Sequence, residues 1–404
     1  MDANLWGLSV LFSILLLTAG CYEPGQVQNG PPSCTNQMVP NSYLVRWNGQ
    51  VPNKYAKYKL HPNSLVTRFS GTTKDFVEKS ILATHNDQFL VAEPEYEITN
   101  IKLEAEQAAN SADSVTPSDS WGQQDIEAGA AWSYLNERGD GVLVAVVDSG
   151  IDVNHPLLKS QIAAAYSFIS GSTDISDEAA HGSHVSGIIA GQAGPNNFTG
   201  VAPNAKIMAL KFIGADGSGQ VGDAISAIVY ANAQGAKVIN ASWGGVNCSL
   251  SLQQEIAAVT QAGSVFVNAA GNSSNDLSVA PEYPAVYQAP GKITVASYDP
   301  SGNISSFSNF GMLVDLAAPG NGIYSTLPPP AGSTTEGNMG LETGTSMATP
   351  FVSGVAALLF SARPSASPTQ IAAAINGGIV PGHIGVRTGG HVDAYLAAQY
   401  LMSH

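Results

Sequence analysis

Short apolar runs alternate with longer amphipathic segments from Trp121 onward. A continuous run of four to eight apolar residues predicts a strand that is covered on both faces. Such strands are expected over residues 142–147, 207–213, 237–241, 265–269, 293–296 and 314–317. Helices are expected over 223–234 and 252–261, because each segment stops just before a glycine. Strands alternating with helices predict an α/β fold, with a largely parallel twisted sheet and helices on both faces.

A smaller α+β unit is expected over residues 41–100, before this region. Strands are predicted at 43–45 and 89–91, with a helix over 74–82 between them. The helix would bury one side, formed by Phe76, Val77, Ile81 and Leu82. A unit of this size is marginal alone. Its flanks have the composition of connecting segments: a spacer over 22–40, rich in Pro, Gly, Asn and Gln, and a polar linker over 101–120.

The first 21 residues predict an export signal. Residues 8–19 are apolar but too few to span a bilayer comfortably, as in a signal peptide. Small residues before Cys21 resemble a bacterial lipoprotein signal, whereas the opening MDANLW has no Lys or Arg and carries Asp2. A lipid on Cys21 and an ordinary cleaved signal both remain open. We expect a protein that is secreted or held in the cell envelope.

Charge and cysteine content narrow the set of partners. The 404 residues carry a net charge of −15, and only 12% of them are charged. This negative net charge argues against nucleic acid and against an anionic membrane surface as binding partners. Of the three cysteines, Cys21 and Cys34 precede the large unit, which leaves Cys248 alone in it. We therefore expect no structural disulfide and a small core residue at Cys248. A monomer is expected.

Four polar motifs lie at the ends of predicted elements. Asp148 ends the run over 142–147, and Asn272 follows the run over 265–269. His181 begins a helix of small and aliphatic residues, and Ser346 lies at a helix start, with Pro350 in its first turn. Taken singly, Asp148 and Asn272 are also typical of turns, and Ser346 of a helix cap. His181 and His184 could bind a metal, but no further metal motif supports that, so we assign His184 a structural role.

Taken together, the four motifs resemble those of the subtilisin-like serine proteases, or subtilases. Asp148 lies in VAVVDSGID, His181 in HGSHVSGIIAG, Asn272 in AAGN and Ser346 in GTSMATP. The order Asp, His, Ser is the one known for subtilisin. The resemblance covers residues from about 121 to 404 and implies an Asp148–His181–Ser346 triad that hydrolyses peptide bonds. It also implies that Asn272 and the Ser346 N–H hold the oxyanion.

The same resemblance assigns substrate-binding segments and an inhibitor. Two backbone walls for an extended protein or peptide substrate are implied at Gly217–Ser218–Gly219 and at Ser242–Trp243–Gly244. Residues 41–100 resemble the inhibitory propeptide of subtilases, so a zymogen that cuts itself within 101–120 is expected. Residues 41–103 hold 8 Lys/Arg and 6 Asp/Glu, whereas residues 118–404 hold 8 and 20. Opposite net charges favour docking of the two.

Specificity and cofactors are less constrained by the sequence. Glu282 precedes Tyr283 and Pro284 in a region that lines the primary specificity pocket of relatives, so it would permit a basic P1 residue. A solvated loop carboxylate is the alternative. No cofactor or catalytic metal is expected. The loop over 194–199 is shorter than the loop that helps bind calcium in calcium-dependent relatives, which leaves only weak structural calcium binding open.

Two other functions remain open on the same scaffold. An acyl-enzyme can be resolved by an amine, which would make the protein a peptide ligase or macrocyclase. An inactive binding scaffold is the third alternative, although a binder would need none of Asp148, His181, Ser346 and Asn272.

Overall fold

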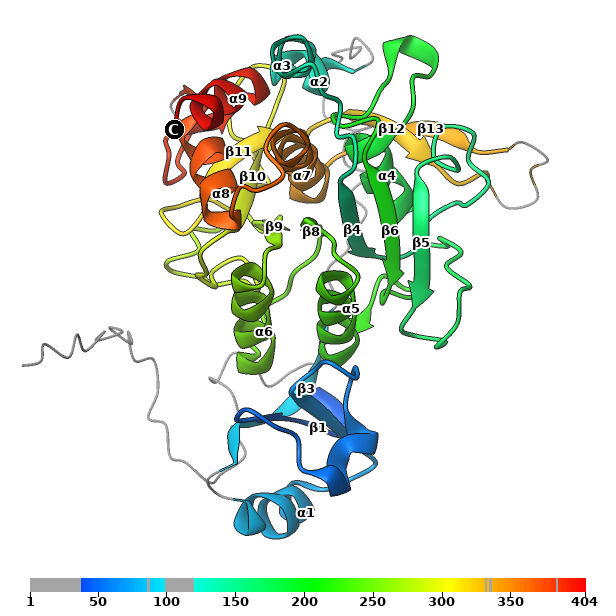
Figure 1. Cartoon of the computed structure of the whole chain (residues 1–404), viewed down its shortest axis with the longest axis vertical. Helices are drawn as coiled ribbons and strands as arrows, with labels where there is room; N and C mark the ends of the chain where they lie inside the picture. Colours follow the sequence, from blue (N-terminus) through cyan, green and yellow to red (C-terminus); the bar gives the residue numbers. More distant parts are fainter. Residues whose placement is uncertain (1–37, 86–87, 99–119, 331–332, 334–335, 383) are drawn as a thin grey trace, which may run out of the picture.

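The computed structural model describes residues 38–85, 88–98, 120–330, 333, 336–382 and 384–404. The expected signal peptide with Cys21, and almost all of the spacer and the linker, lie outside the described residues. Two units are visible in Figure 1: a small N-terminal unit in blue and a large unit that contains the long sheet.

The large unit is built on a nine-stranded sheet. Its strands are β4 (Leu143–Asp148), β5 (Ile162–Ser167), β6 (Lys206–Lys211), β8 (Val238–Ala241), β9 (Val265–Ala269), β10 (Lys292–Tyr298), β11 (Leu316–Pro319), β14 (Ile379–Pro381) and β15 (Gly390–Val392). Their order is β14-β15-β11-β10-β9-β8-β4-β6-β5. Neighbours are parallel except β14 and β15 at one edge. The predicted runs lie on β4, β6, β8, β9, β10 and β11, so the α/β fold is confirmed.

Helices cover both faces of this sheet. One face carries α4 (His181–Ala190), α7 (Thr345–Ala362) and α8 (Pro368–Gly377), with α2 (Trp121–Asp125), α3 (Ala128–Leu135) and α9 (Ala394–Ser403) beyond them. The other face carries the two predicted helices, as α5 (Val221–Ala233) and α6 (Leu250–Gln261). A short 3-10 helix, η6 (Pro195–Asn197), lies in the loop after α4.

The central helix α7 is long and apolar enough to cross a membrane, by length and composition alone. However, 94% of that segment is buried inside the protein, where α7 packs on the strands of the large sheet. It is therefore the core helix of the large unit. A separate hairpin of β12 (Ile323–Leu327) and β13 (Asn338–Glu342) packs against α4.

The small unit is an antiparallel sheet with irregular helices on one side. Its strands are β1 (Met38–Trp47), β2 (Val66–Ser70) and β3 (Phe89–Ile98), in the order β2-β1-β3. Between them lie the 3-10 helix η2 (Asn53–Tyr58), α1 (Lys74–Phe76), the π-helical η3 (Val77–Ile81) and the 3-10 helix η4 (Leu82–Thr84). The strand β1 begins inside the expected spacer, because Met38 pairs with Tyr96.

The segment 74–82, predicted as one helix, consists of a short α-helix, a π-helical turn and the start of a 3-10 helix. Val77, Ile81 and Leu82 are buried, as expected from its pattern. Phe76 was predicted to lie on the same side and is instead 49% exposed. Its position falls where α1 ends and the wider π-helical turns begin, so the 3.6-residue spacing used for the prediction does not hold there.

The small unit docks against the outer side of α5 and α6, as Figure 1 shows. Its strand β3 pairs antiparallel with β7 (Gly219–Gln220) of the large unit, so one four-stranded sheet spans both units. Leu44, Val66 and Tyr96 are buried in the same apolar cluster as residues of α5 and α6. The two units thus share backbone pairing as well as a hydrophobic core.

Candidate active site

Asp148 and His181 meet where β4 ends and α4 begins. The approach requires two glycines: Gly150, at φ 126°, and Gly182, whose Cα faces the Gly150 carbonyl so closely that a Cβ could not fit. Asp148 Oδ1 lies 2.7 Å from His181 Nδ1 and also accepts the Ser149 N–H at 2.7 Å. Both side chains are buried.

The hydrogen bond fixes the state of the imidazole. Because the Asp148 carboxylate accepts, Nδ1 carries the proton in the neutral ring and Nε2 is left with a lone pair. Nε2 is buried, with no hydrogen-bond partner among the described residues. Burial lowers the pKa of His181, but the charge and hydrogen bond of Asp148 outweigh it, with help from Glu342 and Asp177, and the pKa rises to about 8. The ring is therefore a strengthened base.

A second carboxylate, that of Asp177, stabilises the junction of β4 and α4. It accepts the Ser149 hydroxyl and the Ser183 N–H, each at 2.7 Å. The second bond satisfies an N–H in the first turn of α4, where Ala180 offers no side-chain cap and the Ser149 hydroxyl accepts the Gly182 N–H at 3.0 Å. Sequence reasoning did not single out Asp177, since one acid in a polar loop gives no distinctive signal.

Ser346 lies in the first turn of α7. Pro350 was expected in that turn and lies instead farther inside the helix, because α7 already begins at Thr345. Having no N–H, Pro350 cannot bond the carbonyl of Ser346, four residues earlier. The Ser242 hydroxyl takes that place and donates to the Ser346 carbonyl at 2.9 Å. The loop after β8 is thereby tied to the start of α7.

The Ser346 hydroxyl points to the same loop. It donates to the Ser242 carbonyl at 3.0 Å, and no hydrogen bond joins it to His181 Nε2 within the part of the chain described. The helices α4 and α7 that carry these two residues pack against each other. Catalytic hydrogen bonds are often unformed without substrate, so the arrangement is compatible with proton transfer after the Ser346 side chain rotates.

The side-chain amide of Asn272 is oriented by hydrogen bonds to Thr345. Its Oδ1 accepts the Thr345 N–H at 2.9 Å and the Thr345 hydroxyl at 2.8 Å, which leaves Nδ2 to donate elsewhere. A Cβ placed on Gly344 would lie 3.2 Å from Asn272 Nδ2 and 3.7 Å from Ser346 N. Two N–H donors therefore flank the space that Gly344 leaves open. Such a pair can stabilise a developing oxyanion.

The two predicted substrate walls differ in what they present. Gly219 pairs with Ile98 through β7, so the Gly217–Ser218–Gly219 wall is already occupied by the small unit of the same chain. In the Ser242–Trp243–Gly244 segment, the Trp243 side chain is buried, and its indole N–H donates to the Val147 carbonyl at 2.8 Å. Only the backbone of Trp243 is therefore available for the predicted substrate wall, because its ring belongs to the core.

Glu282 is buried rather than solvated, with 5% of its surface exposed. Its carboxylate lies against Gly271, directly beside Asn272 in sequence, and a Cβ on Gly271 would collide with it. No Lys or Arg of the described residues forms a salt bridge with Glu282. A positive group that enters next to this carboxylate would therefore meet no competing Lys or Arg salt bridge among the described residues.

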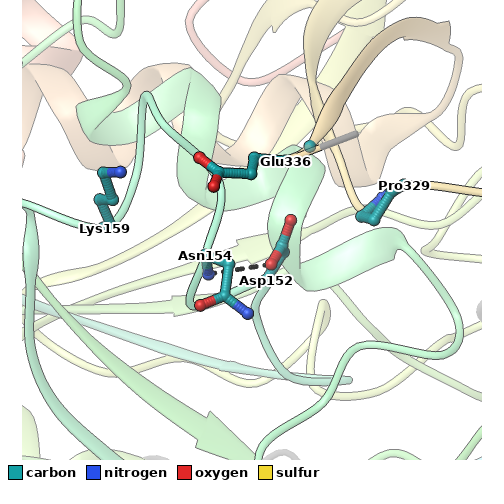
Figure 2. A pocket seen from close by; sticks show the side chains of 6 residues that line it. Asp152, Asn154, Lys159, Pro329 and Glu336 are labelled. Carbon is teal, nitrogen blue, oxygen red and sulfur yellow. Dashed lines mark hydrogen bonds between the residues drawn. The ribbon is translucent and has the colours of Figure 1, made fainter. Parts of the chain in front are cut away.

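Other groups near the site give no metal centre. No cluster of three or more His, Cys, Asp or Glu side chains in the described ranges could hold a metal ion. A cavity of about 330 Å³ is lined by Asp152, Asn154, Lys159, Pro329, Glu336 and Gly337 (Figure 2). It contains none of the candidate catalytic residues. Asp152 accepts the Asn154 N–H at 2.9 Å in it, and the Asp152 N–H donates to Ser183 at 2.9 Å.

Comparisons with known proteins agree with this geometry. Residues 139–380 match the Subtilase family. The chain is 41% identical to thermitase of Thermoactinomyces vulgaris over 283 residues, which are 69% of this chain and 96% of that protein. It is 32% identical to subtilisin J of Geobacillus stearothermophilus over 371 residues, 91% of each chain, so this similarity reaches into the small unit.

Solved structures extend the likeness to the architecture. The crystal structure of fervidolysin from Fervidobacterium pennivorans, a keratinolytic enzyme related to subtilisin, superposes with a TM-score of 0.74 at 26% identity. The match covers 93% of this chain and 63% of fervidolysin. A cold-adapted subtilisin-like serine proteinase matches 64% of this chain at 34% identity, with a TM-score of 0.56.

Proposed function

This chain belongs to the subtilase family and is a serine endopeptidase, and from that premise we propose that Asp148, His181 and Ser346 are its catalytic triad. The observation that carries the proposal is the buried 2.7 Å contact between Asp148 Oδ1 and His181 Nδ1, which leaves Nε2 as the base. Ser346 lies on the helix that packs against the helix of His181.

The reaction follows from these atoms. Ser346 Oγ leaves the Ser242 carbonyl, transfers its proton to His181 Nε2 and forms a bond to the scissile carbonyl carbon. The resulting oxyanion accepts hydrogen bonds from the side-chain amide of Asn272 and the backbone N–H of Ser346. His181 then donates the proton to the leaving amine, whose bond to carbon breaks. A water molecule repeats the sequence on the acyl-enzyme and releases the acid.

We further propose that the small unit is an inhibitory propeptide. Its strand β3 occupies the Gly219 edge, which an extended substrate strand would otherwise use for backbone pairing. The segment that follows β3 is the one in which the maturation cut is expected. The small unit would therefore block the site until the enzyme cleaves its own chain.

Two carboxylates of the small unit support this proposal. Glu93 accepts the N–H groups of Leu250 at 2.9 Å and Ser251 at 3.0 Å, in the first turn of α6. Glu95 accepts the Gly222 N–H at 3.0 Å in the first turn of α5. A carboxylate at a helix N-terminus satisfies N–H groups that the helix leaves open and interacts favourably with the helix dipole.

Arginines of the small unit reach acids of the large unit. Arg68 forms an ion pair with Asp223 at 2.9 Å, and Arg46 pairs with Glu255 in a buried contact. The acidic partners lie on the unit with the strongly negative net charge, as the charge count favours. Export of the precursor, to the medium or the cell envelope, follows in the proposal from the apolar run over 8–19.

For specificity, we propose that Glu282 selects substrates with Lys or Arg at P1. A cationic side chain placed beside its buried carboxylate would gain an ion pair with a group that forms no salt bridge among the described residues. In a peptide library varied only at P1, cleavage should be fastest at Lys or Arg, and Glu282→Gln should remove that preference. A library cleaved no faster at Lys or Arg than at Leu or Phe would contradict it.

A covalent probe tests the catalytic assignment. A fluorophosphonate should label Ser346 in the processed enzyme, as located by peptide mass spectrometry, and His181→Ala should suppress labelling. Asn303→Ala, on an exposed residue, is the matched control and should label normally. Labelling at another serine, or undiminished labelling in His181→Ala, would refute the assignment. Joined or cyclic products instead of cleaved peptides would favour the ligase alternative.

A further inference from the structure

Lys211 is a buried lysine next to the candidate active site that the reaction described above does not use. It ends β6, directly opposite Asp148 at the end of β4, and 9% of its side chain is exposed. A lysine is almost never buried unless its ammonium group is paired and hydrogen-bonded. The partners of this ammonium group therefore indicate what the side chain does in the fold.

The ammonium group of Lys211 joins two segments that are distant in sequence. Its Nζ donates to the carbonyl of Ser149 at 2.5 Å, and Ser149 directly follows Asp148. It also donates to the Ser176 carbonyl and to Glu178 Oε2, each at 2.7 Å. Ser176 and Glu178 lie in the loop that leads into α4, where His181 is the first residue. All three N–H bonds of the ammonium group are thus used.

The two carbonyl oxygens need a donor at this place. The loop passes so close to the end of β4 that a Cβ on Gly150 would lie 2.7 Å from the Ser176 oxygen. Because the Ser149 and Ser176 oxygens both accept from one Nζ, they point to the same buried point, where carbonyls without a donor are costly. The Lys211 ammonium satisfies both. An apolar side chain in its place would loosen the loop from the strand.

We propose that Lys211 is a positioning residue for the Asp148–His181 pair, because its ammonium group ties the strand end that carries Asp148 to the loop that leads to His181. The proposal rests on the proposed function for its catalytic meaning. Lys211 acts through the Ser149 carbonyl and the loop, and the contact that it positions is the 2.7 Å hydrogen bond from His181 Nδ1 to Asp148. A misplacement of about 1 Å in such a contact can lower turnover about 100-fold.

A second lysine on the same strand provides a matched control. Lys206 begins β6, opposite Leu143 at the start of β4, and is exposed. Its Nζ also donates to a backbone carbonyl, that of Ser160, at 2.7 Å. This contact lies at the opposite end of β4 from Asp148. Substitution of Lys206 therefore removes the same kind of bond from β6 without affecting the Asp148–His181 pair.

The tautomer of His181 tests the positioning without any need for activity. Histidine is labelled with heavy nitrogen in the full chain carrying Ser346→Ala, and NMR spectra are recorded well above the His181 pKa of about 8. The ring, assigned by the signal lost in His181→Gln, should carry its proton on Nδ1, because Asp148 accepts it. Lys211→Met should move part of the population to the Nε2 tautomer. Lys211→Arg, which keeps charge and donors, and Lys206→Met should retain the Nδ1 tautomer.

Kinetics of the processed enzyme separate positioning from a structural role. Lys211→Met should lower kcat at least about tenfold while KM changes less than about twofold, because the loosened pair affects the reaction more than substrate binding. Lys211→Arg should recover most of the loss, and Lys206→Met should change neither constant. A lysine that only stabilised the fold would lower the melting temperature and leave both the tautomer and kcat unchanged.

A complete Nδ1 tautomer in folded Lys211→Met, or an unchanged kcat in its processed form, would overturn the proposal. If Lys211→Met does not fold, hydrogen exchange of the lysine ammonium groups is measured in the Ser346→Ala chain. The Lys211 signal, assigned by its loss in Lys211→Arg, should exchange at least about tenfold more slowly than that of Lys206, and equal rates would overturn the proposal. A tautomer that changes as expected in a protein without protease activity would uphold the positioning and refute only the proposed function.

Discussion

The two units of this chain bury their apolar residues in opposite ways. The large unit has a nine-stranded sheet with a core on each face. The small unit has one core of its own, beneath its irregular helices, formed by Val45, Trp47, Val51, Phe69, Val77, Ile81, Leu82 and Ala92. The other face of its sheet, including Leu44 and Val66, is buried only by the large unit.

Because of this difference, the two units depend on different contacts for their stability. Along β1, Leu44 faces the partner unit, whereas Val45 and Trp47 face the small unit's own core, as expected from the two-residue period of a strand. Separation would return Leu44, Val66 and Tyr96 to water, so the small unit gains much of its stability from docking. Under the proposal that the small unit is an inhibitor, it would lose this support for its fold once the chain between the units is cut and docking weakens.

The largest expected effect lies wholly within the large unit. Asn272→Ala removes one of the two donors that flank Gly344, so turnover of the processed enzyme should fall about 100- to 1000-fold, with little change in KM. Steady-state kinetics on a peptide substrate measures it, with Asn303→Ala as the control. A loss of less than about threefold would mean that Asn272 does not bind the oxyanion.

The next effect is the pH dependence of the large unit. The proton on His181 blocks its function as a base, and its pKa is raised to about 8. Below that midpoint, kcat/KM should fall about tenfold for each pH unit. The effect on stability has the opposite direction: the raised pKa stabilises the fold fully below about pH 6.5, and this contribution is lost as the pH rises through about 8. A midpoint near pH 6 in the rate profile would show that Asp148 and Glu342 do not act on His181 as described.

A docking substitution should affect the small unit and leave the processed enzyme unchanged. In the Ser346→Ala chain, Glu93→Gln removes the charge that caps α6, and digestion of the small unit by added chymotrypsin should accelerate at least about tenfold. Glu97→Gln is the matched control on the same strand, since Glu97 pairs with the large unit through its backbone. Equal digestion rates for the two variants would show that Glu93 does not hold the units together.

The smallest effect is expected on the outer side of the small unit. Lys79 pairs with Asp75 at 2.6 Å, but both side chains are more than two thirds exposed. Exposed ion pairs contribute little, so Lys79→Ala in the Ser346→Ala chain should change the chymotrypsin digestion rate less than about twofold. A change as large as that of Glu93→Gln would mean that digestion measures the fold of the small unit rather than its docking.

Sequence patterns predicted the central strands of the large unit because these strands are covered on both faces, unlike the partly exposed edge strands β5 and β14. Continuous apolar runs therefore identified β4, β6, β8 and β9 directly. The residues of the candidate site were found through their motifs, which lie at strand ends and helix starts. Side-chain directions were not predictable in this way: Trp243 lies in a wall segment but packs in the core, and Phe76 is exposed where the helix changes its period.

Contacts between segments that are distant in sequence could not be predicted from the sequence either. Asp177 and Glu342 are single acids in polar or mixed segments, and only the fold brings their charges within range to raise the pKa of His181. The pairing of β3 with β7 involves only the end of β3, at Glu97 and Ile98, and a strand of two residues, which share no sequence pattern. The charge count did favour docking of the two units, but it could not identify Glu93 and Glu95 as helix caps, because they are acids on the less acidic unit.

The central claim is that the large unit releases its own inhibitor through Ser346. It is tested by expressing the chain from Tyr22 as wild type and as Ser346→Ala, and recording the intact mass of each purified product. The account predicts that the wild type loses the small unit by a cut within 101–120, while Ser346→Ala keeps its full length. Processing of Ser346→Ala at the same position and rate as the wild type, in purified form, would contradict it.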